Sequence, residues 1–335
     1  MKAVRLTAFD GPRGLQLLDL PEPRPGENEV LVRIRAASLN YRDLVIARGS
    51  YAQMQLPIIP LSDASGEVVE VGSAVKRFAV GDRVCPHYIM DWVSGPPAAD
   101  TARRRLGGPT DGVLAEYVCL PQHALVRAPA NLSHVQSATL PIAALTAWQA
   151  LFVRASLTPG QTLLTQGTGG VSLFALQLAR AAGVRVIVTS SSAEKLERAR
   201  ALGASAGINY AESPDWPGQV LALTDGQGAD HVIEVVGGNN LKRSIAATRM
   251  GGTISIIGFL ESAEGAIDLR DAFRLVVNVH AISVGARDGF EALVRAVEQN
   301  HIEPVVDRVF GMDDCRAAYE QLASGRHFGK VVIEL

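Results

Sequence analysis

The stretch TLLTQGTGGVSLFALQLARAAGVRVIVTSSS, residues 162–192, decides the fold of the second half of the chain. It opens with a short apolar strand that ends at Gln166 and continues as a turn containing Gly167, Gly169 and Gly170. An amphipathic helix follows, and then a second apolar strand that ends in a run of hydroxyl side chains. This order of strand, helix and strand predicts a βαβ unit, the building block of a parallel sheet.

The glycine turn predicts a phosphate-binding site. A Cβ at these positions would keep the backbone away from a pyrophosphate, and the N-terminus of the following helix offers unpaired N–H groups to an anion. The usual G-x-G-x-x-G pattern has Ser172 at its third glycine, which is still small enough for close packing of helix on strand. A turn that binds no ligand is the alternative. The residues assigned to the dinucleotide here are Gly167, Thr168, Gly169, Gly170 and Val171.

The end of the second strand indicates which dinucleotide is bound. NAD sites place Asp or Glu there for the ribose 2′-hydroxyl, whereas this chain has Ser190 and Ser191, followed by Lys195. Hydroxyl groups can donate to a 2′-phosphate and a lysine can neutralise part of its charge, so the pattern favours NADP(H) over NAD. Ser191 and Glu194 also fit a capping box at the start of the next helix, and the two roles are compatible.

The rest of the sequence divides into regions of different character. Residues 1–128 hold short strand-like runs such as Val30–Ile34 and Gly66–Val71 between Gly/Pro turns, which predicts a mostly-β domain, a partly open barrel. Strands alternate with helices over 129–273, and we expect 274–335 to complete the first domain. The other expected strands are Val184–Thr189, His231–Val236, Thr253–Ile257 and Lys330–Glu334, and the expected helices are Ser137–Leu151, Val171–Ala182, Ala193–Leu202, Leu241–Arg249, Phe290–Asn300 and Asp313–Leu322.

Composition excludes several classes of protein. The formal net charge is −2 and the one run of like charge, Arg103 to Arg105, reads as a solvated loop, so no nucleic-acid partner is expected. Cys85, Cys119 and Cys315 are odd in number and widely spaced, which argues against a disulfide framework or a zinc knuckle. No apolar run approaches the length of a membrane span, and the N-terminus has no signal-like core, so a cytoplasmic location without membrane partners is expected.

A series of further motifs runs through nearly the whole chain. They are Met1-Lys2-Ala3-Val4, Pro21-x-Pro23, Glu29–Val32, Asn40–Asp43, Gly66–Gly72, Val80–Val84, Gly112-x-x-Ala115-Glu116-Tyr117, Gly167–Ser172, Leu202–Ala204, Ile208–Tyr210 and Gly329–Val332. In this order they resemble the medium-chain dehydrogenase/reductases, and among them the zinc-independent, quinone oxidoreductase-like branch. The resemblance implies an α/β protein with a Rossmann-type, doubly wound parallel sheet domain and a GroES-like, mostly-β catalytic domain.

The resemblance also implies that the chain holds no metal. Zinc-containing relatives have a cysteine where this chain has Asn40, a His-Glu pair at Ser62-Asp63 and a third ligand near Ile142. A second zinc site with four cysteines corresponds to Pro86–Gly112, which contains none. These side chains cannot supply the tetrahedral set that zinc prefers.

Loss of the metal directs the expected reaction towards activated acceptors. Alcohol oxidation in the zinc relatives depends on a Lewis acid, whereas a quinone or a conjugated C=C bond can take a hydride without one. We therefore expect an NADPH-dependent reductase of a quinone or an α,β-unsaturated carbonyl. A zinc-independent alcohol or aldehyde oxidoreductase, and a catalytically inactive NADPH-binding protein with a structural or regulatory role, remain the alternatives. The partners implied are a small-molecule substrate and a second copy of the chain, with Thr253–Ile257 and the segment after it as a candidate edge.

The resemblance finally assigns individual residues. Asn40 is expected to contact a carbonyl or the nicotinamide ribose, and Tyr51 to donate a proton, as the tyrosine of related enoyl reductases does. A phenol with a pKa near 10 suits a donor better than a base. The residues expected to border the cofactor outside the glycine turn are Tyr210, Gly237, Gly258, Phe259, Phe328 and Lys330.

Overall fold

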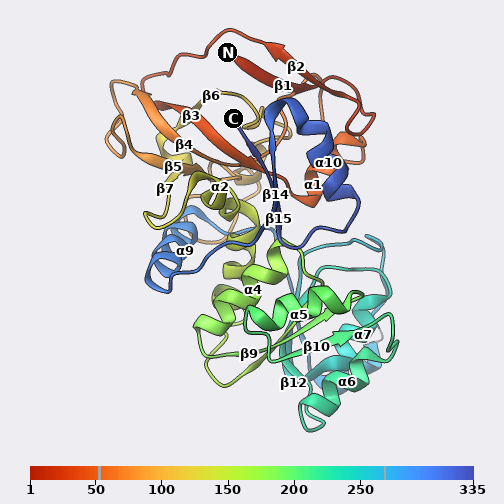
Figure 1. The fold of residues 1–335 in the computed structure, drawn as a ribbon. Helices are drawn as coiled ribbons and strands as arrows, with labels where there is room; N and C mark the ends of the chain where they lie inside the picture. Colours follow the sequence, from red (N-terminus) through yellow and green to blue (C-terminus); the bar gives the residue numbers. More distant parts are fainter. Residues whose placement is uncertain (52–53, 268) are drawn as a thin grey trace. The chain divides into compact units, whose positions relative to one another are not determined.

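The computed structural model describes residues 1–51, 54–267 and 269–335 (Figure 1). It forms two compact units, one made of Met1–Leu145 with Gly285–Leu335 and the other of Thr146–Val284. Both boundaries fall later than the expected limits of 128 and 273. The first falls later because the helical segment after residue 130 packs on the sheet of the first unit, and the second because the strand at 278–281 joins the sheet of the second.

A twisted, mainly antiparallel sheet forms the centre of the first unit. Its order is β14-β15-β3-β4-β5-β7. Strand β6 pairs with residues 29–33 of β3, ahead of the residues that pair with β15, and β1 and β2 form a separate hairpin. The C-terminal strand β15 lies between β14, to which it is parallel, and β3, to which it is antiparallel. The strands are β1 (Lys2–Leu6), β2 (Leu15–Asp19), β3 (Glu29–Ser38), β4 (Asp63–Val71), β5 (Arg83–Pro86), β6 (Tyr117–Pro121), β7 (Leu125–Arg127), β14 (Val306–Gly311) and β15 (Lys330–Glu334).

Short helices border this sheet. Helix α9 carries the expected amphipathic pattern and buries Phe290, Leu293, Val294 and Val297. The helices are α1 (Tyr41–Ala47), α2 (His134–Ser137), α9 (Arg287–Gln299) and α10 (Cys315–Ala323), with 3-10 turns at Thr101–Arg103, Gln122–Ala124 and Met312–Asp314.

The segment expected as one helix over 137–151 is divided. Two π-helical turns, Leu140–Ala144 and Gln149–Arg154, flank the short helix α3 (Leu145–Trp148). Pro141 has no N–H to donate, so the regular i to i−4 ladder cannot pass through this turn.

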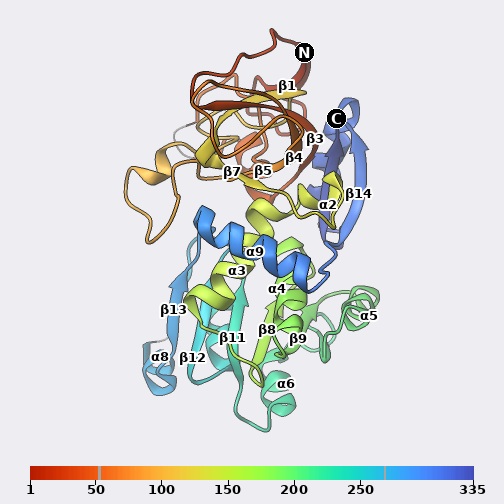
Figure 2. The same ribbon diagram turned by 90° about the vertical axis from the view of Figure 1, so that its left-hand side faces the viewer.

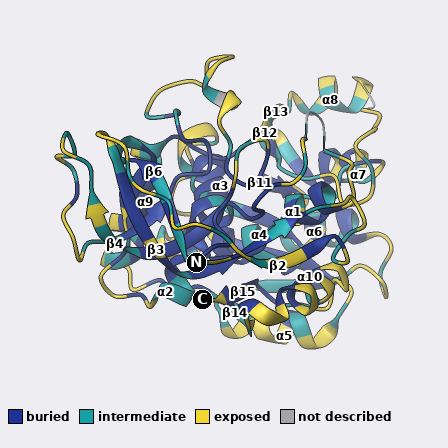
Figure 3. Ribbon diagram, turned by 90° about the horizontal axis from the view of Figure 1, so that it is seen from above, coloured by how far each residue is buried: buried dark blue, intermediate teal, exposed yellow. Residues whose placement is uncertain are grey.

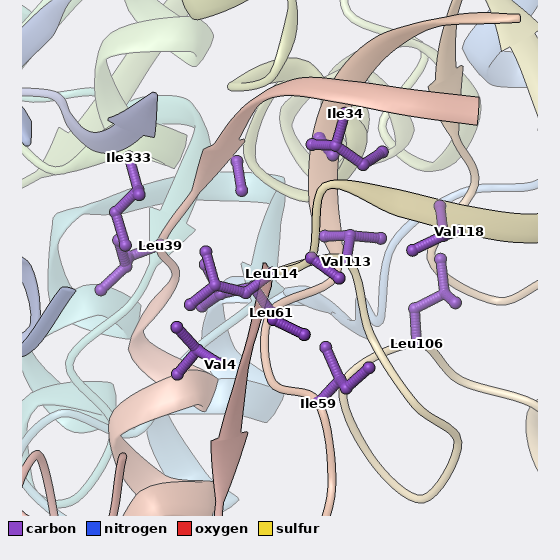
Figure 4. Close-up of a cluster of buried hydrophobic side chains, with 14 of the residues drawn as sticks. Val4, Ile34, Leu39, Ile59, Leu61, Leu106, Val113, Leu114, Val118 and Ile333 are labelled. Atoms are coloured by element: carbon purple, nitrogen blue, oxygen red, sulfur yellow. The ribbon is translucent and has the colours of Figure 1, made fainter. Parts of the chain in front are cut away.

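The hydrophobic core of the first unit holds its functional loops in place. Figure 4 shows side chains from β1, β3, β15 and the 106–118 segment converging on Leu61. Leu61 is fully buried and has φ +65, an uncommon conformation for a side chain of this size. A Cβ added to Gly112 would lie 1.9 Å from the Leu61 carbonyl oxygen, so glycine is required where the two backbones meet. This packing fixes the direction of the chain just before Ser62 and Asp63.

A parallel sheet with the order β10-β9-β8-β11-β12-β13 forms the second unit. Figure 2 shows β9, β8, β11, β12 and β13 side by side in that order. The strand order reverses between β8 and β11, which is the arrangement of a doubly wound sheet. The strands are β8 (Thr162–Gln166), β9 (Arg185–Ser190), β10 (Ala206–Asn209), β11 (Ala229–Glu234), β12 (Thr248–Ile256) and β13 (Asn278–Ala281).

Helices link these strands. Trp216 and Val220 of α6, with Leu241 and Ile245 of α7, pack into the same cluster as the sheet residue Leu164. The expected helix 241–249 ends at Ala247, because Thr248 turns into extended backbone and already pairs with β11. The helices are α4 (Gly170–Ala181), α5 (Ala193–Ala201), α6 (Trp216–Leu223), α7 (Asn240–Ala247) and α8 (Leu269–Leu275).

Candidate functional site

The glycine turn leaves backbone exposed between β8 and α4. Gly167 has φ +72, and Gly169 is the extended residue before the helix, with no side chain capping the first N–H groups. A Cβ added to either glycine would meet no heavy atom within 4 Å, so the glycines leave open space above the turn. Unpaired N–H groups beside open space are what a pyrophosphate requires, so the turn fits a dinucleotide.

The Ser172 side chain lies on the buried side of this turn. Its buried hydroxyl donates to the carbonyl oxygen of Gln166 over 2.7 Å. A glycine in this position could not make that bond, so the departure from the usual glycine pattern adds a hydrogen bond that ties α4 to the end of β8.

The hydroxyl run after β9 is divided between the helix cap and the sheet edge. Helix α5 begins one residue later than the proposed capping box requires, and its cap is Ser192, whose Oγ accepts from the Lys195 N–H over 3.3 Å. The prediction of Ser191 with Glu194 as the capping box was therefore wrong. Ser191 remains exposed beside Ser190, whose Oγ accepts from the Ser192 N–H.

Tyr210 lies at the same edge of the sheet. It follows β10 directly, its N–H donates to the Ser190 carbonyl oxygen over 3.1 Å, and 44% of its surface is exposed. The structure thus brings Ser190, Ser191 and Tyr210 to neighbouring strand ends, with Lys195 on the first turn of α5.

The loops after β11 and β12 approach each other closely. Gly237 has φ +73, and a Cβ there would lie 2.9 Å from the Phe259 Cα. A Cβ on Gly258 would lie 2.6 Å from the Val235 carbonyl oxygen. Phe259 itself is half exposed. Gly237, Gly258 and Phe259 therefore lie together at the carboxyl ends of the strands, where doubly wound sheets bind ligands.

A buried carboxylate that the sequence interpretation missed holds this region together. Glu234 is fully buried at the end of β11 and accepts from the N–H groups of Val236 and Gly237 over 2.8 and 3.0 Å. Its other oxygen accepts from Gln166 Nε2 over 3.2 Å, from Asn240 Nδ2 over 3.0 Å and from Ser244 Oγ. The network joins β8 to β11 where the strand order reverses. The available signal was a glutamate closing an apolar strand before two glycines.

In the first unit, Asn40 is the centre of a second buried network. It precedes α1, and its Nδ2 donates to Asp63 Oδ2 over 2.9 Å. Lys330 Nζ donates to Asn40 Oδ1 and to the Leu39 carbonyl oxygen, both over 2.6 Å, and lies 3.8 Å from Asp63 Oδ2. The amide of Asn40 is therefore held at both ends, between a cation and a carboxylate.

Burial dominates the electrostatics of this network. It raises the pKa of Asp63 from 3.8 to about 6, although the nearby Lys330 and the Asn40 amide both lower that pKa. Burial likewise raises the pKa of Asp43 and lowers that of Lys330. Each shift disfavours the charged form, as expected for ions removed from water.

The positions that hold zinc in the related metalloenzymes come together here as hydrogen-bonding groups. Besides Asn40, Asp63 Oδ2 accepts from the Ile142 N–H over 3.2 Å, and Ser62 Oγ accepts from Arg42 Nη1 over 3.2 Å. One carboxylate, one amide, one hydroxyl and an aliphatic side chain do not fit the tetrahedral nitrogen and sulfur donor set of zinc. Within 1–51, 54–267 and 269–335, no group of three or more His, Cys, Asp or Glu residues is arranged to hold a metal ion.

Tyr51 lies in a cationic and aromatic cluster of the first unit. Its ring is 5.4 Å from the guanidinium carbon of Arg42 and 5.5 Å from that of Arg105. Partial burial raises the pKa of Tyr51, but a hydrogen bond with Tyr88 and the two guanidinium groups outweigh it, so the pKa lies below its ordinary value of 10.0. Burial raises the pKa of Tyr88 to about 12. The cluster makes Tyr51 the more acidic of the two phenols.

The two C-terminal residues expected at the cofactor are both buried. Phe328 is 2% exposed and its N–H donates to Asp307 Oδ1, while Lys330 directs its ammonium to Leu39 and Asn40. In this arrangement the Lys330 ammonium is occupied by these two oxygen atoms and orients the Asn40 amide.

Two further observations bear on the class of protein. Across the described parts of the chain, no helix has the length and apolar character needed to cross a lipid bilayer. A doubly wound sheet with an open glycine turn, in a chain that also carries a mostly-β unit, is typical of a dinucleotide-binding protein.

Comparisons with known proteins identify the family. Residues 26–130 match the alcohol dehydrogenase GroES-like domain and residues 170–299 match the zinc-binding dehydrogenase domain. The chain is 45% identical over 318 residues to a zinc-type alcohol dehydrogenase-like protein of Schizosaccharomyces pombe, covering 93% of this chain and 91% of that protein. It is 32% identical to a quinone oxidoreductase-like protein 2 homolog of Nematostella vectensis, over 92% of this chain and 82% of that protein. The chain belongs to the medium-chain dehydrogenase/reductase family.

Solved structures agree with this assignment. A putative alcohol dehydrogenase from Sinorhizobium meliloti superposes with a TM-score of 0.93 at 44% identity, covering 100% of this chain and 98% of that one. An NAD-dependent alcohol dehydrogenase superposes with a TM-score of 0.92 at 36% identity over the whole of both chains. A mycobacterial protein complexed with NADPH has a TM-score of 0.84 at 27% identity, again over both whole chains. The expected Rossmann-type and GroES-like domains are thereby confirmed.

Replacing Asp63 by Asn tests the buried carboxylate. Because its pKa is raised from 3.8 to about 6 on folding, the folded chain binds this proton more tightly than the unfolded chain. The stabilisation is complete at low pH and is lost as the pH rises through this window. Between about pH 4 and pH 7, we expect the free energy of unfolding of the wild type to fall relative to Asp63→Asn by as much as about 3 kcal/mol, measured by urea denaturation.

Asp82→Asn is the matched control for this measurement. A hydrogen bond from Arg127 lowers the pKa of the partly exposed Asp82, so its contribution has the opposite sign and is already complete above about pH 4. A difference between wild type and Asp63→Asn that does not change with pH contradicts the raised pKa.

Proposed function

We propose that this oxidoreductase uses NADPH to reduce a quinone or an α,β-unsaturated carbonyl compound without a metal ion. The observation that carries the proposal is the Lys330–Asn40–Asp63 network, because it places groups that hydrogen-bond to one another at the metal-ligand positions of the zinc relatives. The quinone oxidoreductase-like relative from Nematostella vectensis supports the same branch of the family.

The residues of the first unit would act on the acceptor and on the charge that develops there. When bound, NADPH supplies a hydride to the electron-poor carbon of the acceptor. Asn40 Nδ2 has a second hydrogen beyond the one given to Asp63, and it is the donor that we assign to the acceptor carbonyl or to the nicotinamide ribose. Tyr51 would transfer its proton to the enolate or phenolate and recover one from solvent, a role that its lowered pKa suits.

A second candidate function is the zinc-independent oxidation of an alcohol or reduction of an aldehyde. It is favoured by Asp63, since a carboxylate with a pKa of about 6 can accept a proton near neutral pH. The zinc-type alcohol dehydrogenase-like relative and the alcohol dehydrogenase structures support it as well. A protein that binds NADPH without turnover is the remaining alternative.

A parallel assay with NADPH and a quinone, an enone or an aldehyde separates these candidates. We expect oxidation of NADPH, followed by its absorbance, with the quinone or the enone. Turnover of the aldehyde alone would favour the second candidate, and tight NADPH binding without turnover of any acceptor would favour the third. In the same assay Tyr51→Phe should lower kcat about 100-fold, the usual contribution of a general acid, whereas the exposed neighbour Tyr41→Phe should leave it unchanged.

The cofactor preference rests on the end of β9. Ser190 and Ser191 occupy the position at which NAD sites have a carboxylate, and Lys195 lies in the first turn of α5. The NADPH complex among the structural relatives supports this choice, while the NAD-dependent relative illustrates the alternative.

Lys195→Ala tests the 2′-phosphate assignment. Loss of one charge-assisted contact should raise the KM for NADPH about tenfold and leave the KM for NADH unchanged. Lys242→Ala, an exposed lysine of α7, is the control. Equal effects of Lys195→Ala on both cofactors, or no effect on either, would show that Lys195 does not contact the 2′-phosphate.

We also propose that the chain forms a homodimer through its second unit. The expected edge at Thr253–Ile257 was misplaced, because β12 lies inside the sheet between β11 and β13, and β13 is the edge strand. Beside it, α8 buries no residue and presents Leu269 and Phe273, 78% and 86% exposed (Figure 3). An open strand edge beside a helix with two exposed apolar side chains is suited to pairing with a second copy of the chain.

Phe273→Asp tests this interface. We expect the wild type to sediment at twice its chain mass of 35.5 kDa and the variant to sediment as a monomer at the same concentration. Val80→Asp, at an apolar position of the first unit that is 65% exposed, should not change the mass. A wild type that sediments as a monomer contradicts the proposal.

A further inference from the structure

Arg105 differs from the other cations that surround Tyr51. It belongs to the irregular segment 86–112 and is held by a backbone bridge to Ile89, next to Leu106, whose N–H donates to the Tyr88 carbonyl oxygen. Tyr88 and Arg105 are therefore on adjacent backbone segments, with Arg105 partly exposed and Tyr88 buried.

Arg42, the neighbouring arginine, uses both of its terminal nitrogens in hydrogen bonds to the protein, although its Nε, like that of Arg105, is buried without a partner. Its Nη1 donates to Ser62 Oγ and to the Leu106 carbonyl oxygen, and its Nη2 donates to the Gly108 carbonyl oxygen. Asp43 lies 3.7 Å from Nη1 and compensates the charge. Arg42 thus supports the loop and leaves little capacity for a ligand.

The side chain of Arg105 makes no such hydrogen bonds to the described residues. Across 1–51, 54–267 and 269–335, no carboxylate forms an ion pair with it and no acceptor takes a hydrogen bond from its side chain, while its Nε is buried without a partner. Its contact is the face of the Tyr51 ring, 5.5 Å away. Arg104, the preceding residue, instead pairs with Asp91. A partly buried guanidinium with unused donors is costly unless an acceptor arrives with the ligand.

We propose that Arg105 is a specificity-determining residue that binds a carboxylate group of the acceptor, beside the bond that is reduced. The inference rests on the proposed function and narrows it to quinones or α,β-unsaturated carbonyls that carry a carboxylate. Two parallel N–H groups of a guanidinium match the two oxygens of a carboxylate, and stacking on Tyr51 orients that fork. Because Tyr51 contacts the same guanidinium, the anchored carboxylate and the proton donor lie side by side.

A matched pair of acceptors tests this inference. The neutral enone 4-phenyl-3-buten-2-one and its para-carboxylate derivative differ in one charged group, so we expect the wild type to reduce the carboxylate about tenfold or more faster in kcat/KM. Arg105→Gln should lower kcat/KM for the carboxylate about 30-fold and for the neutral enone only about threefold, the smaller loss coming from the contribution of Arg105 to the lowered pKa of Tyr51. Arg105→Lys keeps the charge without the fork and should fall between them. Arg103→Gln, at an exposed arginine, is the control and should match the wild type.

Direct binding separates failure of the inference from failure of the proposed function. Calorimetric titration of the carboxylate enone into the NADP⁺-loaded protein should give binding that Arg105→Gln weakens about 30-fold, whether or not the enone is reduced. Binding without reduction overturns the proposed function and retains the carboxylate site. Equal losses for the two enones in Arg105→Gln, or a wild type without preference for the carboxylate, overturn the inference and show that Arg105 acts only on Tyr51.

Discussion

The hydrogen bonds that hold Asn40 between Lys330 and Asp63 are the constraint on which the first unit depends. They join strand β15, the start of α1 and the start of β4, segments separated by up to 290 positions. Lys330 and Asp63 are almost completely buried, so neither can lose its partner without leaving an uncompensated charge. The same bonds fix which end of the Asn40 amide is oxygen and which is nitrogen. The atoms that stabilise the first unit are therefore also the atoms that position the amide that we assign to the ligand.

A corresponding constraint operates in the second unit, where Glu234 accepts backbone and side-chain donors from both sides of the strand-order reversal. It holds the Gly237 turn while the open backbone of Gly167 and Gly169 faces the space where a pyrophosphate fits. Both units thus place a buried polar network beneath the residues assigned to ligands. Each network holds its members by several hydrogen bonds within the protein, so the groups that we assign to ligands are positioned before a ligand arrives.

Local patterns were sufficient to predict much of this fold. The C-terminal strand Lys330–Glu334 has the predicted bounds, and β8 and α4 lie within a residue of them, because apolar period, glycine turn and helix length all agree there. The cap of α5 was misplaced by one residue, since four successive hydroxyl residues each satisfy the chemistry of a cap. The long β12 was expected to begin five residues later because Thr248 to Gly252 look like a helix end and a turn, and pairing with β11 overrides that preference.

The site was harder to predict than the fold because its partners are distant in sequence. Nothing near Asn40 indicates that its amide will meet Asp63 and Lys330, and nothing near Tyr51 indicates that Arg105 will stack on its ring. The family pattern selected Asn40, Tyr51 and Lys330 as candidates, but their contacts depend on the sheet that brings β15 beside β3.

We propose that an amide held by a buried ion pair takes the place of the metal. The most direct measurement is kcat for reduction of an enone or quinone as a function of bound zinc, after chelation and then graded addition of the metal. If the Asn40 amide replaces the metal, we expect full activity at negligible zinc content and no increase in kcat when zinc is added. Activity that rises in proportion to bound zinc, reaching its maximum near one ion per chain, would contradict it.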